Sequence, residues 1–163
     1  MEVSHRLLTP NDEAVLWTAL YHALHVPPGA DPFPADIVHR PDLALYVAGW
    51  MQRPGDLGVA AESPDGPVGA AWLRCWPGPP HGYGFVDTAT PELSMALLPA
   101  YRGRGVGTAL LRRLLAEAAG QFDGVSLSVS ASNPARRLYE RAGFVVLHAD
   151  RSSVTMVKRF DRP

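Results

Sequence analysis

A glycine-rich turn between two apolar runs constrains the fold of this chain more than any other stretch. Residues 102–107 read Arg-Gly-Arg-Gly-Val-Gly, between a strand-like run at 93–98 and a helix-periodic run at 108–119. Another apolar run at 125–129 follows, and a strand, helix and strand with short connections form a parallel pair. Because the turn has almost no side-chain bulk, several backbone N–H groups can converge on one anion. The stretch predicts an anion site where a strand leads into a helix.

The remaining patterns predict a single domain, because 163 residues are too few for two ordinary ones. Four prolines within residues 26–34 require a loop, and Pro41 limits where the second helix can run unbroken. Turn-forming residues at 62–67 join two apolar runs into an antiparallel hairpin. The predicted strands are 3–8, 57–61, 68–76, 93–98, 125–129, 144–147 and 154–158, and the predicted helices are 13–24, part of 35–51, 108–119 and 134–142.

Composition and charge exclude several classes of partner. Hydrophobic residues make up 47% of the chain, charged residues 19%, and the formal net charge is −1. This balance offers no broad basic face for nucleic acid and no polybasic anchor for a membrane. No secretory leader or membrane-spanning run is present, so we expect a soluble, cytoplasmic protein. Cys75 is the only cysteine, and His22 and His25 lack further ligands nearby, so we expect no metal and a small-molecule partner.

Two common phosphate-binding motifs do not match the turn. A Walker loop needs Lys and then Ser or Thr after its last glycine, but Thr108 and Ala109 follow here. A dinucleotide fingerprint places its third glycine one position later and an acidic residue about 20 residues on, but here the next strand ends in Ser-Val-Ser at 128–130. Glycines at such a junction can also serve only to make a tight turn. Three alternate glycines, however, are more than a turn requires.

The turn and its surroundings resemble the acetyl-CoA-binding motif of the GCN5-related N-acetyltransferases. The motif Arg/Gln-x-x-Gly-x-Gly/Ala is met by residues 102–107, and residues 133–144 resemble the late helix and the turn into the next strand of that family. The clear resemblance covers residues 91–147. It implies an α/β (α+β) fold of one domain over residues 1–163, with a mixed, mostly antiparallel sheet of about six to seven strands. A central parallel pair would splay apart, and about four helices would flank the sheet.

The resemblance also implies a set of cofactor contacts. Backbone groups at the end of the first strand of the splayed pair would bond the pantetheine arm and the thioester carbonyl in place of a neighbouring strand. The glycine turn and the helix N-terminus would surround the pyrophosphate. The strand contacts would be Met95, Ala96 and Leu97, and the pyrophosphate contacts Arg102, Gly103, Arg104, Gly105, Val106, Gly107 and Thr108.

One further cofactor contact departs from the family pattern. Many relatives have an Asn that contacts the pantetheine three residues before the helix Ala, and that position holds Ser132 here. Asn133 lies one residue later. Ser132 could make the contact, a shifted helix start could let Asn133 serve, or Asn133 could only cap the helix before Pro134. All three interpretations stay open.

Two residues are candidates for the chemistry. The resemblance makes Tyr139 the general acid that protonates the leaving thiolate, although its ring could simply pack between helix and sheet. A phenol has a pKa of about 10 and a thiol about 8.5, so the transfer is uphill unless the site or water assists. The resemblance also makes Glu92 the candidate general base acting through water, although a carboxylate at a strand start could simply be a solvated strand end. His81 and Tyr83 lie in the preceding loop and could face the acceptor.

These features predict an acetyl-CoA-dependent N-acetyltransferase that moves an acetyl group to a primary amine by direct attack. The acceptor would be a small-molecule amine or an exposed protein amino group. A fold relative that binds acyl-CoA without turnover, or a transferase for a longer acyl group, is the alternative. Homodimerisation stays open, because one sequence does not locate a self-complementary face.

Overall fold

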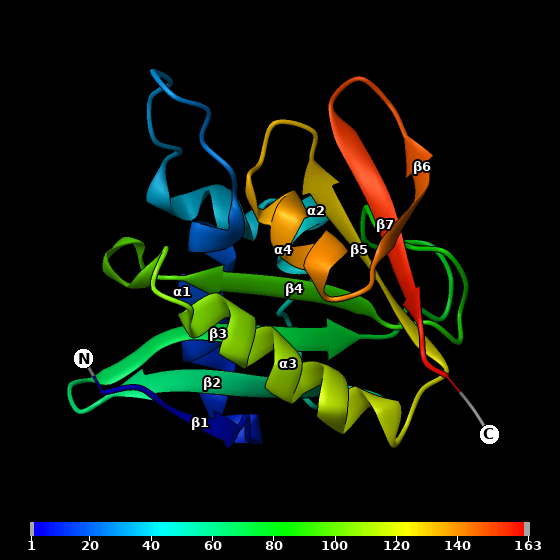
Figure 1. Cartoon of the computed structure of the whole chain (residues 1–163), viewed down its shortest axis with the longest axis horizontal. Coiled ribbons are helices and arrows are strands. Elements are labelled where there is room, and N and C mark those ends of the chain that lie inside the picture. Colours follow the sequence, from blue (N-terminus) through cyan, green and yellow to red (C-terminus); the bar gives the residue numbers. More distant parts are fainter. Residues whose placement is uncertain (1, 162–163) are drawn as a thin grey trace.

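The core of the molecule is a seven-stranded sheet with the order β1-β2-β3-β4-β5-β7-β6 (Figure 1). The computed structural model describes residues 2–161. All neighbouring strands are antiparallel except β4 and β5, which run parallel at the centre. The strands are β1 Ser4–Leu7, β2 Leu57–Ser63, β3 Gly66–Arg74, β4 Glu92–Leu97, β5 Gly124–Ser130, β6 Val145–Ala149 and β7 Ser153–Arg159.

Helices cover both faces of this sheet. The helices α3 (Val106–Ala119) and α4 (Ala135–Arg141) lie in front of it in Figure 1, and α1 (Glu13–Ala23) and α2 (Pro41–Ala44) lie behind. Each face has its own apolar cluster, because alternate residues of a strand point to opposite sides. One cluster joins α3 to the inner strands, and the other joins α1 to Trp72, Trp76 and neighbouring residues. Short 3₁₀ turns at Pro10–Asp12, Ala35–His39 and Pro99–Tyr101 connect these elements.

The parallel pair at the centre is joined at one end only. β4 pairs with β3 along its whole length, from Glu92 opposite Arg74 to Leu97 opposite Gly69. Its pairing with β5, in contrast, is limited to Glu92 opposite Ser126. The two strands therefore separate beyond that point, as the resemblance implied.

The predicted elements are confirmed, and several of their bounds are shifted along the chain. A helix occupies part of 35–51, as predicted, but it is only the short α2 after a 3₁₀ turn, because Pro41 starts a helix and cannot continue one. Helix α3 begins at Val106, two residues before the predicted start, because Gly105 ends the turn in a left-handed conformation (φ +81°). Glu92 is buried, not solvated at a strand end.

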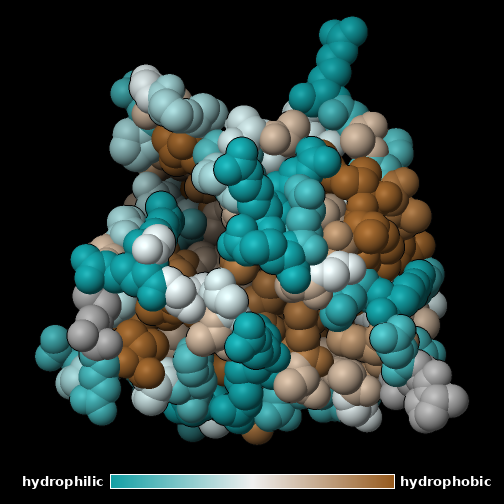
Figure 2. Space-filling view, in the orientation of Figure 1, coloured by the Kyte–Doolittle hydropathy of each residue, from teal (hydrophilic) through white to brown (hydrophobic). Residues whose placement is uncertain are grey.

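The sheet ends in an exposed apolar edge at β6. The side chains of Val145, Val146 and Leu147 are 62%, 44% and 57% exposed. Figure 2 shows the corresponding brown surface at this edge of the molecule. β6 pairs with β7 on one side only. Its other side therefore leaves backbone hydrogen-bonding groups without a partner strand among residues 2–161.

Candidate active site

The open side of β4 presents unpaired backbone to the gap between β4 and β5. The predicted contact residues Met95, Ala96 and Leu97 lie beyond the single pairing of Glu92 with Ser126. Their backbone groups that point away from β3 therefore meet no strand. An extended, amide-containing ligand can bond such an edge as an added strand would.

The glycine turn that follows β4 leaves a group of backbone donors free. Gly103 and Gly105 have φ of +71° and +81°, a conformation that disfavours other residues. Within residues 2–161, no backbone or side-chain acceptor is found for the amide N–H groups of 103–108. A Cβ on either glycine would meet open space, so packing does not dictate a glycine there. These donors, at the positive end of α3, form a site suited to an anion.

The two arginines of the turn differ in their contacts. The Arg102 side chain donates from Nε to the Leu97 carbonyl at 3.2 Å and from Nη2 to the His22 carbonyl at 3.1 Å. It thereby ties the end of α1 to the end of β4 and keeps its charge beside the turn. The Arg104 side chain is exposed and forms no ion pair with the described residues. Arg104 is thus the freer of the two to approach a phosphate.

Helix α4 borders the same opening and carries Tyr139. A Cβ on Gly107 would lie 3.5 Å from Leu97, 3.7 Å from Leu138 and 3.9 Å from Met95, so the first turn of α3, the end of β4 and α4 converge. The Tyr139 ring is 7% exposed and packs edge-on against Phe144, with ring centroids 5.9 Å apart.

The Tyr139 hydroxyl makes no hydrogen bond within the described part of the chain, and burial raises the pKa of this phenol to about 12. The phenol therefore stays protonated at neutral pH. Proton donation to a thiolate, with a thiol pKa of about 8.5, is then uphill in the ligand-free protein. A thiolate placed beside the hydroxyl would supply the hydrogen-bond acceptor that the phenol lacks.

Asn133 and Ser132 precede α4 in the loop after β5. Pro134 directly precedes α4, and the side-chain oxygen Oδ1 of Asn133 accepts the N–H of Ala135, the first residue of the helix, at 2.9 Å. Ser132 is exposed. The capping interpretation of Asn133 thus has a geometric basis, and a pantetheine contact by either residue stays a prediction.

Glu92 lies at the closed end of the gap with both oxygens occupied. The Tyr46 hydroxyl donates to Oε2 at 2.6 Å, and the Trp76 indole donates to Oε1 at 3.0 Å. The residue is only 3% exposed. Burial raises the pKa of Glu92, and the hydrogen bonds from Tyr46, Trp76 and the Gly84 N–H act in the opposite direction. A role as general base stays a prediction.

Sequence reasoning missed Tyr46 as a partner of this carboxylate. The two residues are 46 positions apart and belong to different elements. Tyr46 also accepts the N–H of Tyr83 at 2.7 Å, so it joins β4 to the 77–91 loop. No spacing pattern connects such residues, because the contact depends on how the turn after α2 packs behind the sheet.

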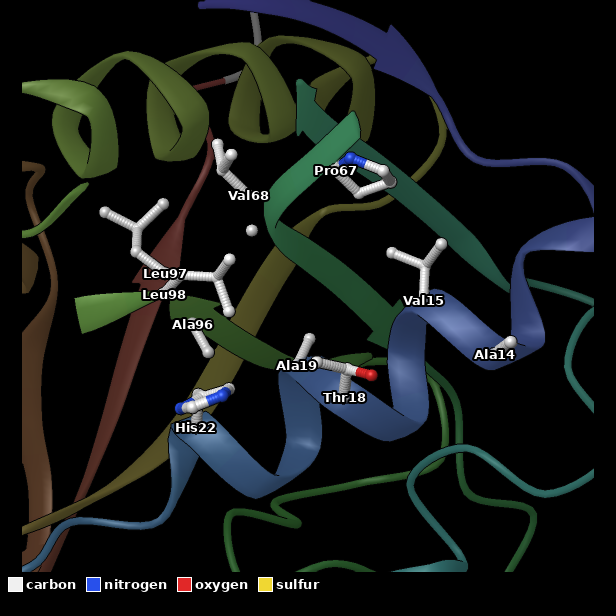
Figure 3. Close-up of a pocket in the computed structure, with 11 residues that line it drawn as sticks. Ala14, Val15, Thr18, Ala19, His22, Pro67, Val68, Ala96, Leu97 and Leu98 are labelled. Atoms are coloured by element: carbon white, nitrogen blue, oxygen red, sulfur yellow. The ribbon is translucent and has the colours of Figure 1, made fainter. Parts of the chain in front are cut away.

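A cavity of about 280 Å³ lies behind the end of β4, between that strand and α1 (Figure 3). Its walls are mostly apolar, and Thr18 and His22 supply the polar side chains. Burial lowers the pKa of His22, and the nearby charge of Arg102 acts in the same direction. The lining shares Ala96 and Leu97 with the predicted cofactor contacts but includes no predicted catalytic residue.

The described residues contain no helix long and apolar enough to cross a membrane. Within them, no three His, Cys, Asp or Glu side chains are grouped closely enough to hold a metal ion. These are findings on residues 2–161 alone.

Comparison with known folds gives strong matches over the whole chain. The structure of yncA from Salmonella typhimurium with its cofactor acetyl-CoA superposes with a TM-score of 0.68 at 23% identity, covering 100% of this chain and 96% of the other. PaiA N-acetyltransferase from Thermoplasma acidophilum, in complex with coenzyme A, gives 0.69 at 17%, covering 98% and 100%. The ribosomal-protein-S18-alanine N-acetyltransferase from Escherichia coli gives 0.66 at 18%, covering 99% and 96%. At these identities the matches show the fold.

No curated protein matches the sequence significantly. The model of the acetyltransferase (GNAT) domain family does match, over residues 54–146. That segment contains β4, the glycine turn and β5, and it extends into β6. It is more than half of the chain, and the chain therefore belongs to the GNAT acetyltransferase family.

Proposed function

We propose that this protein is an acetyl-CoA-dependent N-acetyltransferase that acetylates a primary amine by direct attack on the thioester. The observation that carries the proposal is the run of unpartnered amide N–H groups at 103–108, directly after the open edge of β4. Similar folds have been solved with acetyl-CoA and with coenzyme A, which supports the same donor here.

Different residues along the gap between β4 and β5 would bind different parts of the cofactor. The backbone of Met95, Ala96 and Leu97 would bond the pantetheine arm and polarise the thioester carbonyl. The turn from Arg102 to Thr108 would hold the pyrophosphate, with the glycines allowing close backbone approach. Ser132 or Asn133 would add a contact to the arm.

In the chemical step, the amine nitrogen attacks the thioester carbon, the carbon–sulfur bond breaks, and its electron pair leaves on sulfur. Tyr139 would supply the proton to the departing thiolate. Its position in α4, beside the first turn of α3, and its unpartnered hydroxyl support this role. The sequence also predicts Glu92 as the base, and a carboxylate buried this deeply would have to act through a chain of other groups.

The acceptor would be a small-molecule amine or an exposed protein amino group. A similar fold belongs to a ribosomal-protein-S18-alanine N-acetyltransferase, which supports a protein amino group as one kind of acceptor. A cytoplasmic location is compatible with either kind of acceptor. Assembly as a homodimer is compatible with the exposed apolar edge at β6.

The main rival is an acyl-CoA-binding module without turnover, which the raised pKa of Tyr139 favours because a reluctant proton donor slows thiolate departure. The test measures free thiol released from acetyl-CoA with a panel of amines, alongside calorimetric CoA binding. Amine-dependent release supports the enzyme. Stoichiometric binding without release supports the module, and faster release from longer acyl-CoA donors would revise the acyl group.

A further inference from the structure

The loop before β4 is fixed against the closed end of the gap by two glycines. A Cβ on Gly82 would collide with Oε1 of Glu92 and with the Tyr46 hydroxyl, and a Cβ on Gly84 would lie 2.6 Å from the carbonyl carbon of Leu127. The Ser126 hydroxyl donates to the Gly84 carbonyl at 2.7 Å. Residues 82–84 therefore lie directly over the part of β5 where the strands begin to separate.

Two tyrosines hold this loop from the other side. The Tyr83 N–H donates to the Tyr46 hydroxyl, and the Tyr83 hydroxyl donates to Asp42 of α2. The loop is thus anchored to α2, to β4 through Glu92, and to β5. Both oxygens of the Glu92 carboxylate already accept hydrogen bonds in this anchoring. Taking a proton from a substrate would therefore disrupt the bond to Tyr46 or the bond to Trp76.

His81 stands next to these anchors with one ring nitrogen available. Its Nδ1 lies 2.9 Å from the Gly82 carbonyl oxygen, which can only accept, so Nδ1 carries the proton and Nε2 holds the free lone pair. The ring stacks on Phe85, with centroids 4.2 Å apart and planes 16° apart. The imidazole is exposed, and it interacts electrostatically with Glu92. The Nδ1 contact fixes the tautomer of the neutral ring and the stacking on Phe85 fixes its plane, and Nε2 has no hydrogen-bond partner among the described residues.

We propose that His81 is the general base of the transfer and that Glu92 is a positioning residue that fixes the loop carrying it. The assignment rests on the proposed acetyltransferase function. Nε2 takes one proton from the incoming ammonium and leaves a neutral amine, whose lone pair forms the new carbon–nitrogen bond. The carbon–sulfur bond then breaks, and the departing sulfur receives a proton from the Tyr139 hydroxyl. The new amide nitrogen still carries one proton too many, and it passes this proton to the Tyr139 oxygen. The imidazolium then returns its proton to solvent.

The test compares His81→Ala with wild type on two amine acceptors, one strongly and one weakly basic, with and without added imidazole. General base catalysis contributes about 10²–10⁴-fold, so we expect kcat/KM to fall at least about 100-fold with the strongly basic acceptor. The loss should be only a few-fold with the weakly basic amine, which arrives neutral. Imidazole should restore part of the rate. His148→Ala, an exposed histidine of β6, is the matched control and should behave as wild type.

The outcomes separate the two proposals. An equal loss on both acceptors without imidazole rescue, or no loss, would overturn the assignment to His81 while wild-type turnover keeps the acetyltransferase function. A wild-type protein that binds CoA but acetylates no amine overturns the function and the assignment with it. Unchanged melting temperature and CoA affinity in His81→Ala, repeated in His81→Gln, show that a lost rate is not a lost fold.

Discussion

The two ends of β4 differ in how the fold treats polar groups. At its start, Glu92 is buried, and each carboxylate oxygen receives a hydrogen bond from an aromatic side chain. At its end, the strand runs into an exposed turn whose amides at 103–108 have no acceptor within the described chain. One end completes its hydrogen bonds internally, and the other leaves backbone donors unpaired within residues 2–161.

The difference separates groups that hold the structure from groups that bind. Buried polar groups are paired because an unpaired one costs about 1–3 kcal/mol, whereas an exposed donor loses little while water replaces its partner. A ligand that displaces this water gains several bonds without any rearrangement of the protein. We therefore expect changes at the start of β4 to affect stability and changes beyond its end to affect ligand binding.

The largest expected effect is on stability, from Glu92→Gln. The Gln side chain has one acceptor oxygen and one donor NH₂ group, so either Tyr46 or Trp76 would face a donor instead of an acceptor. The free energy of unfolding should therefore fall by about 3 kcal/mol. Urea unfolding measures this change, and CoA affinity of the folded variant should not change. A variant as stable as wild type would mean that the start of β4 does not depend on these bonds.

Tyr139→Phe extends the comparison to α4, across the gap. The hydroxyl makes no hydrogen bond in the described protein, so its removal should leave the melting temperature unchanged. If it donates the proton, the acyl-transfer rate should fall about 100-fold, or about 2.7 kcal/mol in activation free energy. Steady-state thiol release measures the rate. An unchanged rate at every pH would remove Tyr139 from the mechanism.

Gly105→Val tests the end of β4. A valine at φ +81° is strained, so some stability is lost whatever the function. Gly66→Val is the matched control, since Gly66 also has a positive φ (+126°) and open space, but is the first residue of β3, far from the glycine turn in sequence. Calorimetry should show CoA binding weakened about tenfold in Gly105→Val alone, or about 1.4 kcal/mol. Equal CoA affinity in both variants would contradict the pyrophosphate site.

The smallest effect concerns a paired carboxylate outside the site. Hydrogen bonds from Arg6 lower the pKa of Asp12 to about 2, against burial, which acts to raise it. Because the folded-state pKa lies below the ordinary 3.8, the stabilisation is present above that value and is lost as pH falls through about 2. Asp12→Asn should cost about 1 kcal/mol at pH 7, since water screens the half-exposed Arg6, and almost nothing well below the folded-state pKa. A difference independent of pH in chemical unfolding would exclude the ion pair as its source.

The sequence predicted the later half of the chain more accurately than the first. Residues 91–147 alternate strand, glycine turn, helix and strand with short connections, so local pattern and handedness leave one arrangement. A helix was predicted only in part of 35–51 with no definite bounds, and the segment forms a 3₁₀ turn, the four-residue α2 and turns. Its local propensity is weak, and its conformation follows from packing Tyr46 and Val47 against the sheet.

The candidate site likewise has one part that could be predicted from the sequence and one part that could not. The donors of the glycine turn could be predicted because they belong to consecutive residues whose conformation is set locally by glycine. The surroundings of Glu92 could not, because Tyr46, Trp76 and Gly84 reach it from three separate segments. The tautomer of His81 likewise depends on a loop fixed by contacts to α2, β4 and β5.

The sequence by itself therefore determined the order of elements, the parallel pair and the glycine turn before α3, since these follow from periodicity, short connections and glycine. Only the tertiary structure decided which polar groups are paired. It placed Glu92 among donors from distant segments and left the amides of 103–108 without acceptors. The physical reason is that pairing in a folded chain is set by which segments are packed together, and that information is spread over the whole sequence.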